Sequence, residues 1–548
     1  MTMSLLGGLG VFLLGMLLLT DGLKAVAGEA LRRILTRSIR SPLSGVGWGA
    51  IVTALVQSST ATTLTTVGFV SAGLLTFSQA VGVVFGANLG TTSTGWIVSQ
   101  LGFKISLGGI APPLVLAGVA LRLLGKGRAA HAGTALAGFA LLFMGIDLLQ
   151  DGMASLSSRL APGDLPSGDG WTSRLILVGF GFVMTVVMQS SSASMTTTLA
   201  AVASGAIGLE QAAALIVGQN IGTTPTAVAA AIGAPAAAKR TAAAHVLFNV
   251  ITAGVALAIL PWLLGASHAI GAAAGADDAP TTLALLHTIF NLLGVALLLP
   301  LVGPFSRALE RLFPERGPRS TRYLAPSVAH VGPVAQEAAR RALMQALADA
   351  AGVARTLLRD PRRRAHTASP LAEAASGLRA VMRFIHQLGR ASQGALEGER
   401  QQSLAHAADH LERLIAALRA PPAGADRLST DDELRPAVQI VGGLAERLCG
   451  AVPSAGADPA EADRRFAATV ADAAHASRAM ADLRILKRPE ALHLAASGAL
   501  EPEDAMARVD SLLWLDRIAY HLWRAAHHLR LDAHASPAEP AEAAPPAP

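Results

Sequence analysis

The sequence predicts an all-α protein: a polytopic membrane half made of two inverted repeats with re-entrant hairpins, followed by a cytoplasmic helical-bundle domain. The first supporting observation is charge, because residues 1–304 hold only 13 of the 44 Lys and Arg and 9 of the 38 Asp and Glu. A low charge is typical of a membrane protein, and the charge of residues 305–548 is typical of a soluble one. The other two observations are an internal repeat and two uncharged runs whose length fits neither one membrane crossing nor two.

Composition also excludes some partners and sites. The net charge is +6, but basic residues alternate with acidic ones or flank apolar segments, and there are only two Tyr, so we expect no nucleic acid partner. Cys449 is the only cysteine, which excludes an internal disulfide and a cysteine-rich metal site and fits a reducing compartment. No basic residue precedes the first apolar segment, so we expect that segment to be retained as a membrane span.

Two polar motifs occur twice, and the spacing between them is the same in both copies. The sequence QSSTAT at 57–62 returns as QSSSAS at 189–194, and GANLGTT at 86–92 returns as GQNIGTT at 218–224. Upstream, Gly15 and the Asp-Gly pair at 21–22 return at nearly the same shift, as Gly145 and the pair at 151–152. Three motifs in the same order predict two homologous repeats, about 5–124 and 131–303.

Each repeat contains a long uncharged run, at 41–103 and at 175–209. Residues 42–75 would form one helix of roughly 50 Å, too long for a hydrocarbon core of about 30 Å and too short for two crossings with a turn. We therefore expect a re-entrant hairpin with helices near 44–56 and 61–74, and a second near 175–188 and 193–207. An unwound tip at that depth is permissible only where it lines a polar cavity.

The remaining apolar segments are expected to be full crossings, near 5–23, 80–101, 105–124, 131–150, 211–233, 241–264 and 282–303. Placing the N-terminus outside puts most basic loops and the C-terminal domain in the cytoplasm, as the positive-inside rule requires. Three crossings separate each element from its counterpart, so the copies are expected to be inverted around a site near the bilayer midplane. We expect a multi-pass protein of a cell membrane, most simply a bacterial inner membrane, surrounded by the lipid bilayer.

Hydroxyl and amide side chains concentrate at the two expected hairpin tips. Eight of the ten residues in 57–66, and again in 189–198, carry such a side chain. A single cluster is commonly explained by bonding back to the helix or by close packing, whereas two at equivalent tips favour a binding site. Hard neutral oxygens suit an alkali cation, and helix N-termini suit an anion. The expected binding residues are Gln57, Ser58, Ser59, Thr60, Thr62, Asn88, Thr91, Thr92, Gln189, Ser190, Ser191, Ser192, Ser194, Asn220, Thr223 and Thr224.

The spans that carry the two Asn-containing motifs are expected to be interrupted, because Gly pairs flank each Asn and Pro225 favours a break. The alternative is a Gly-rich packing surface. Asp147 is the deepest of the membrane acids and could couple a cation or proton, whereas Asp21 and Asp151 equally fit the membrane interface. No transition-metal site is expected.

The duplicated Gln-Ser-Ser-[Ser/Thr]-Ala-[Ser/Thr] motif, each copy followed by Gly-x-Asn-x-Gly-Thr-Thr, resembles the sodium-dependent phosphate cotransporter family of the type II sodium/phosphate kind, in its bacterial form with a PhoU-like tail. The resemblance covers about residues 5–303. It implies inorganic phosphate as substrate, sodium as coupling ion with no other cofactor, and symport by alternating access. It also implies that the two Gln-led tips line a shared site, supported by the two Asn-containing motifs.

Residues 330–531 are expected to form six amphipathic helices in two three-helix bundles, after a basic linker at 305–329. The helices are expected near 333–359, 370–395, 401–419, 431–450, 460–486 and 503–531. The match to PhoU rests on Asp516–His521 and His410–Leu414, and both lack the family's second acid, at Tyr520 and at Ala416. We therefore do not expect the metal clusters that some PhoU proteins carry. Residues 532–548 are rich in Pro, Ala and Glu and are expected to be disordered.

These patterns leave alternatives beside a sodium-coupled phosphate symporter with a cytoplasmic regulatory domain. Ser-rich hairpins also suit a sodium-coupled carboxylate carrier, and the helical tail suits a membrane-anchored, phosphate-responsive regulator. An enzyme is disfavoured, because no nucleophile with a base, nucleotide loop or metal triad stands out. A homo-oligomer is left open.

Overall fold

The computed structural model describes residues 2–104, 107–157, 166–315, 317–324, 332–360, 364–388, 395–428, 430–452 and 459–530. Two compact units divide the chain: Met1–Val70 with Leu75–Pro314, and Ser71–Leu74 with Glu315–Pro548. All regular elements in the described ranges are helices, which confirms the predicted all-α class.

Five of the described helices in the first unit are long and apolar enough to cross a membrane, namely α1, α6, α7, α11 and α13. Seven crossings were predicted, and four of them are among these five helices, as α1, α6, α11 and α13; the fifth helix, α7, was predicted as one arm of a hairpin. The predicted crossings at 80–101, 105–124 and 211–233 are not among the five: the first contains most of α4 and the start of η1, the second keeps an α-helix of only 14 residues, and the third is divided between α9 and α10. The helices of this unit are α1 (Thr2–Arg37), α2 (Pro42–Val56), α3 (Ser59–Ser71), α4 (Phe77–Ile97), the π-helical η1 (Val98–Lys104), η2 (Leu107–Ile110), α5 (Ala111–Leu124), α6 (Arg128–Ser157), α7 (Gly170–Met188), α8 (Ser191–Ala203), α9 (Leu209–Ile221), α10 (Thr224–Ala231), α11 (Ala236–Ala258), α12 (Leu260–Ala273), α13 (Ala279–Leu298) and α14 (Val302–Leu312).

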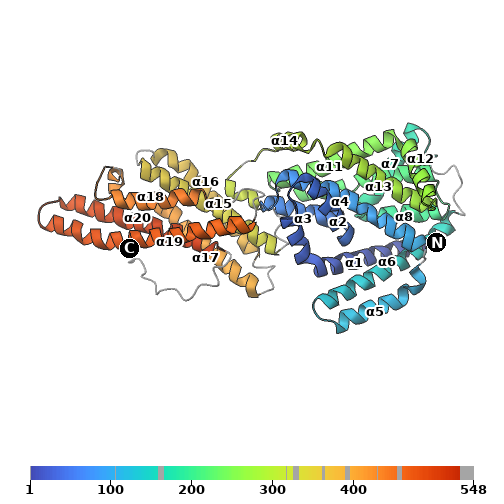
Figure 1. The fold of residues 1–548 in the computed structure, drawn as a ribbon, viewed down its shortest axis with the longest axis horizontal. Helices are drawn as coiled ribbons and strands as arrows, with labels where there is room; N and C mark the ends of the chain where they lie inside the picture. Colours follow the sequence, from blue (N-terminus) through green and yellow to red (C-terminus); the bar gives the residue numbers. More distant parts are fainter. Residues whose placement is uncertain are drawn as a thin grey trace. The chain divides into compact units, whose positions relative to one another are not determined.

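Helices α1, α6 and α5 lie side by side (Figure 1). Glycines allow α1 and α6 to approach closely: a Cβ on Gly15 would lie 2.4 Å from the backbone nitrogen of Leu142, and one on Gly138 would lie 2.3 Å from that of Leu19. Small residues at such contacts are typical of helix packing in membranes, where lipid supplies no hydrophobic driving force.

Both predicted helix pairs are present, with their turns at the predicted Gln residues. Ser41 caps α2, and Pro42 occupies the first turn, where its missing N–H costs nothing. Helix α2 ends at Gln57, and α7 ends at Gln189. Helix α7 has 19 residues and is longer than the expected 175–188, because it begins at Gly170.

The two helices expected to be interrupted behave differently. The regular helix is interrupted at Gly222 and Thr223 between α9 and α10, as Pro225 predicted, although both residues keep right-handed backbone angles. The prediction is wrong for the first copy, since α4 runs unbroken through Asn88 to Ile97 and then continues into η1. The position of Pro225 is occupied by Ser93 in the first copy, whose N–H can stay in the helix.

The first helix of each pair docks on the helix that follows the pair, through glycine contacts at equivalent positions of the two repeats. A Cβ on Gly86 would lie 2.1 Å from the carbonyl oxygen of Val46, and a Cβ on Gly218 would lie 2.0 Å from that of Val178. The packing of α2 on α4 therefore recurs, carbonyl for carbonyl, in the packing of α7 on α9.

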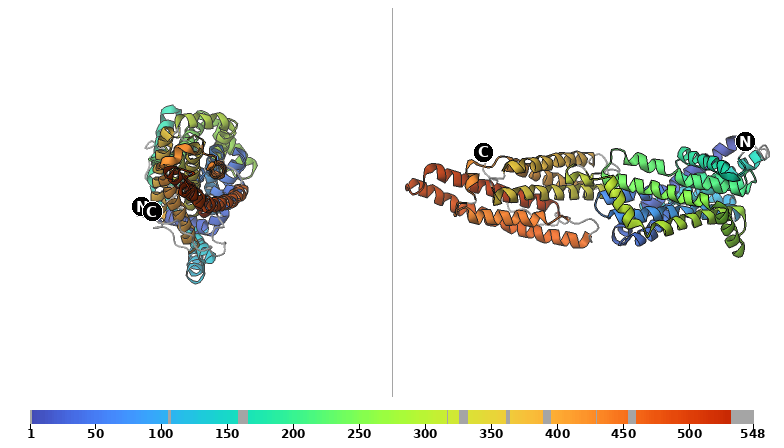
Figure 2. Two further views of the ribbon diagram at one scale, coloured as in Figure 1. Left: turned by 90° about the vertical axis from the view of Figure 1, so that its left-hand side faces the viewer. Right: turned by 90° about the horizontal axis from the view of Figure 1, so that it is seen from above.

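Within its described residues, the second unit contains six long helices that run alongside one another (Figure 2). Helices α15, α16 and α17 pack together, as do α18, α19 and α20, but α17 also packs on α20 and α15 on α18, so the six helices are not separated into the two predicted bundles. Helix α19 runs beyond its expected end at 486 as far as Ala496, because Pro489 lies inside the helix instead of ending it. The expected linker contains part of α14 and the 3-10 helix η3 (Arg319–Tyr323), and residues 532–548 lie outside the described residues. The six helices are α15 (Gly332–Arg359), α16 (Arg364–Leu388), α17 (Ala395–Arg419), α18 (Arg435–Cys449), α19 (Pro459–Ala496) and α20 (Pro502–His528).

Candidate functional site

The two predicted tips share an unusual backbone conformation. Gln57 and Gln189 have φ of 56° and 51° and are the non-glycine residues with positive φ in the described chain. A left-handed residue between two right-handed helices reverses the chain direction, at a cost of order 1 kcal/mol for a side chain other than Gly. Sites that retain such strain are often functional.

The next residue in each copy caps the following helix. The Ser58 hydroxyl accepts the N–H of Ala61 at 3.2 Å, and the Ser190 hydroxyl accepts the N–H of Ala193 at 3.2 Å. The N-termini of α3 and α8, with their N–H groups and positive dipole ends, therefore lie at the tips. Three further predicted residues, Ser59, Thr60 and Ser191, are half-buried in the first turns of these helices.

A chain of hydrogen bonds links the first tip to the second helix pair. The Thr94 hydroxyl on α4 donates to the Gln57 Oε1 atom at 2.9 Å and lies 3.1 Å from the Ser192 hydroxyl on α8. Gln57 also donates from Nε2 to the Ser93 hydroxyl at 3.0 Å. Thr94 and Ser192 are buried, at 3% and 7% exposure. Residues 57 and 192, predicted from two separate motifs, are thus brought together through Thr94.

Other predicted residues of the first copy are satisfied nearer to their own helix. The Asn88 Nδ2 donates to Val84 O at 2.9 Å, and the Thr91 and Thr92 hydroxyls bond to carbonyls of α4. The Thr62 hydroxyl donates to Ser58 O at 3.1 Å. These bonds hold the side chains in place, and they do not connect Asn88, Thr91 or Thr92 to the tip.

The second copy uses its equivalent residues differently. The Asn220 Nδ2 donates to Asn249 Oδ1 on α11 at 2.7 Å, with both residues buried. The Thr223 and Thr224 hydroxyls donate to carbonyls at the end of α9, where the helix is broken. Gln189 is exposed and bonds to Val186 O at 2.6 Å, so the second tip lacks the contact that Thr94 provides for the first.

Sequence reasoning missed Ser93 and Thr94, which bond to Gln57, and Asn249, which bonds to Asn220. Thr94 follows shortly after the first Gly-Thr-Thr, and the unbroken hydroxyl run at 91–94 was the available signal. Asn249 carried no signal in the repeat, since it lies beyond both motifs.

A second group that the sequence did not reveal is a histidine cluster between α17 and α20. The Nδ1 atoms of His410 and His521 are 3.1 Å apart, and the His528 ring stacks on His406 and His410 at centroid distances of 5.1 and 5.7 Å. Burial lowers the pKa of His410 and His521 to about 4 and that of His528 to about 3, with nearby guanidinium groups adding to the effect.

These lowered pKa values predict acid sensitivity of the second unit. Between about pH 6.5 and 4, these histidines bind protons in the unfolded chain but stay neutral in the folded one. The free energy of unfolding should therefore fall as the pH falls from about 6.5 toward 4. His521→Leu should reduce this dependence, because the unfolded variant gains one proton fewer. We expect its Tm difference between pH 7.5 and 4.5 to be roughly 5–10 °C smaller than in the wild type, as measured by thermal unfolding of the full chain. An equal difference in both proteins would contradict the assignment.

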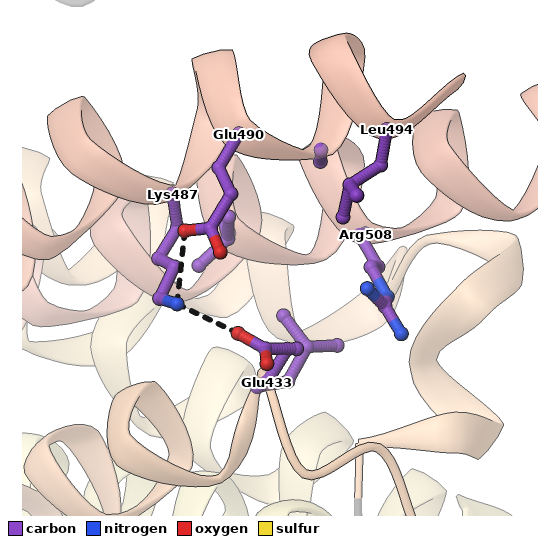
Figure 3. A pocket seen from close by; sticks show the side chains of 8 residues that line it. Glu433, Lys487, Glu490, Leu494 and Arg508 are labelled. Carbon is purple, nitrogen blue, oxygen red and sulfur yellow. Dashed lines mark hydrogen bonds and ion pairs between the residues drawn. The ribbon is translucent and has the colours of Figure 1, made fainter. Parts of the chain in front are cut away.

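A pocket in the second unit holds paired charges (Figure 3). It is lined by Glu433 before α18, Lys487 and Glu490 on α19, and Arg508 on α20, among others. Lys487 Nζ lies 2.7 Å from a Glu433 oxygen and 2.9 Å from a Glu490 oxygen, and Arg508 binds Asp431 at 2.7 Å. The charged side chains of this pocket are thus paired with neighbouring charges. Among the described residues no group of three or more His, Cys, Asp or Glu is arranged to hold a metal ion.

Comparison with known proteins concerns mainly the first unit. The Na+/Pi-cotransporter family matches residues 11–151 and 170–269. YqeW of Bacillus subtilis, an uncharacterized protein, is 33% identical over 260 residues, which are 47% of this chain and 80% of YqeW. No solved structure matches the chain.

Two further relatives carry functional names. YjbB of Salmonella typhimurium, named as a candidate inorganic phosphate export protein, is 30% identical over 270 residues, which are 48% of this chain and 47% of YjbB. The human sodium-dependent phosphate transport protein 2B is 37% identical over 99 residues, only 14% of its length. The chain thus spans about half of YjbB and a small part of the human protein. The family match over both repeats, together with the similarity to most of YqeW, shows that the chain belongs to the Na+/Pi-cotransporter family, whose members are transporters and not enzymes.

Proposed function

We propose that the chain is a sodium-coupled inorganic phosphate symporter working by alternating access, with a cytoplasmic PhoU-like domain that regulates it. The observation that carries the proposal is the contact from Gln57 through Thr94 to Ser192, because it joins one tip motif to the other in a buried position. Family membership supports phosphate and sodium as the ligands.

The chemistry of the tips suits an anion together with a cation. The capped N-termini of α3 and α8 offer N–H groups and positive dipole ends to phosphate. The hydroxyl and amide oxygens of Gln57, Thr94 and Ser192 are hard neutral ligands for sodium, whose charge offsets that of phosphate.

The recurrence of the glycine contacts in both copies supports two repeats of one design. We infer that the copies are inverted, that the Gln-led turns are tips of re-entrant hairpins entering from opposite faces, and that the N-terminus lies outside and the second unit in the cytoplasm. Rocking of one repeat bundle against the other would then expose the loaded site to alternate faces.

Labelled phosphate flux tests the function directly. Proteoliposomes of the full chain should take up phosphate several-fold faster under an inward sodium gradient than under an equal choline gradient, and preloaded vesicles report export in the same way. Succinate and glutamate as competitors test the carboxylate alternative: inhibition by either at concentrations where phosphate saturates would favour that carrier. Phosphate binding without flux in either direction would favour a regulator.

Ser190→Ala should weaken phosphate and sodium together, because the hydroxyl fixes the N-terminus of α8 and lies next to Ser191 and Ser192. Loss of an N-cap costs about 1 kcal/mol, and we expect roughly a fivefold rise in the half-saturating concentration of both ions. Ser190→Asp, which restores a capping acceptor but adds negative charge, should rescue folding without rescuing phosphate. Unchanged affinities in Ser190→Ala would remove Ser190 from the site.

A further inference from the structure

Three buried oxygen atoms on α7, α8 and α9 lack hydrogen-bond partners among the described residues. They are the hydroxyl oxygens of Thr185 on α7 and Ser194 on α8, and the Oε1 atom of Gln219 on α9. The three residues are 1%, 0% and 2% exposed. A buried polar atom without a partner is costly, and each instance in a native structure calls for a specific reason such as a bound water or ion.

The three side chains come from three helices that meet at one place. The Thr185 Cβ packs against Gly222, where a Cβ would lie 2.6 Å away, and Gln219 lies one turn before Gly222 on the same face. The Gln219 Nε2 donates to Ser194 O at 3.2 Å and to the Thr198 hydroxyl at 2.7 Å, which ties α9 to α8 beside Ser194.

The first repeat shows what the same positions do when they are satisfied. The counterparts of Thr185 and Ser194 in the first copy are Thr53 and Thr62, and the Thr53 hydroxyl donates to the Thr62 hydroxyl at 2.9 Å. The counterpart of Gln219 is Ala87, which has no polar side-chain atom. The second repeat therefore has one more buried amide and two fewer satisfied hydroxyls than the first.

We propose that Thr185, Ser194 and Gln219 form a binding site for a monovalent cation, sodium, that only the second repeat contains. Neutral hydroxyl and amide oxygens are hard ligands that need no charge compensation around a monovalent ion, and a cation satisfies all three atoms at once. No carboxylate lies in this set, which disfavours a divalent ion.

This site is distinct from the contact between the tips. Ser192 and Ser194 are two residues apart on α8, so their side chains point to opposite sides of the helix. The Ser192 hydroxyl contacts Thr94, whereas at Ser194 it is the backbone carbonyl that accepts a hydrogen bond, from Gln219 on α9. The inference rests on the proposed function in one respect, the choice of sodium as the ion. Occupancy would fix α7, α8 and α9 together and so prepare the N-terminus of α8 for phosphate.

The test measures binding of radioactive sodium to the purified full chain without phosphate, beside sodium-dependent phosphate flux. Gln219→Ala copies Ala87 of the first repeat, and Thr185→Val removes one hydroxyl without changing size. Each should raise the sodium concentration for half-maximal binding at least about tenfold, and should make the sodium dependence of flux less steep. Thr241→Val is the matched control, because Thr241 is equally buried and its hydroxyl is satisfied by Ala237 O in its own helix. It should stay within about twofold of the wild type.

Two outcomes separate this inference from the proposed function. If Gln219→Ala and Thr185→Val both bound sodium as the wild type does, and phosphate flux still depended on sodium, the proposed site would be overturned and the proposed symporter would not. Water would then be the partner of these three oxygen atoms. Saturable sodium binding that both variants lose, in a protein whose phosphate flux ignores sodium, would support the site and overturn the symporter. If Gln219→Ala does not fold, Ser194→Thr serves instead: it copies Thr62, gives Thr185 a partner, and should weaken sodium binding in the same way.

Discussion

Replacing Gly218 by alanine is expected to abolish the proposed phosphate transport and to destabilise the first unit. The new Cβ would lie 2.0 Å from the carbonyl oxygen of Val178 and 2.7 Å from its carbonyl carbon, both backbone atoms that cannot move without moving α7. Overpacking of this kind commonly costs about 1–3 kcal/mol, and separating two helix backbones puts this case at the upper end. The equivalent change, Gly86→Ala, meets Val46 O at 2.1 Å and should behave in the same way.

The controls are one glycine on α2 and one on α7, the helices against which α4 and α9 pack. Gly47 and Gly179 have nothing within 4 Å of an added Cβ, and they too occupy equivalent positions of the two repeats. Gly47→Ala and Gly179→Ala should therefore keep wild-type stability or gain slightly, since alanine favours a helix. The unfolding temperature of each purified variant is measured by heating samples and following the loss of the monodisperse peak in size-exclusion chromatography. If Gly218→Ala and Gly179→Ala unfolded at the same temperature, the close docking of α7 on α9 would be contradicted.

Gln57→Ala should reduce affinity for phosphate more than any other change at the tips. Alanine removes the acceptor of the Thr94 hydroxyl and the donor to Ser93, each worth about 1 kcal/mol, while keeping a strained left-handed residue. We expect a rise in half-saturating phosphate of roughly 30-fold. Gln189→Ala should have a smaller effect, because Gln189 is exposed and bonds only to its own helix.

Flux at varied phosphate separates binding from turnover in these variants. Gln57→Asn tests the cause, since asparagine tolerates the left-handed conformation but its shorter amide falls short of Thr94. It should retain folding and lose affinity. Equal losses in the variants of Gln57 and Gln189 would contradict the asymmetry of the two tips.

Much of the architecture was predictable from sequence because repetition and charge are global signals. The helix pairs, their turns at Gln57 and Gln189, the break before Pro225 and the six C-terminal helices follow from motif spacing, apolar length and periodicity. The unbroken α4 was not predictable from the Gly pair around Asn88. Glycine is common both where a membrane helix is broken and where two helices pack closely, so the pattern alone does not distinguish the two. Here Gly86 and Gly90 allow α4 to pack closely against α2.

The site was predictable in its residues and not in its connections. Gln57 and Ser192 were expected to line one site, but the sequence did not show that Thr94 connects them. In a helix rich in hydroxyl side chains, the sequence does not show which hydroxyl points toward a neighbouring helix. The histidines of α17 and α20 lie 111 positions apart at their closest pair, so only the packing of the two helices brings them together.

The glycine docking of α2 on α4, and of α7 on α9, restricts how this molecule can move. Two backbones that interlock at each turn cannot slide or twist past one another without separating, so each pair should behave as a single lever. In the alternating access proposed for this chain, the bending that opens one side and closes the other would then be located where helices meet through hydroxyls such as Thr94 and Ser192, whose hydrogen bonds can be exchanged one at a time.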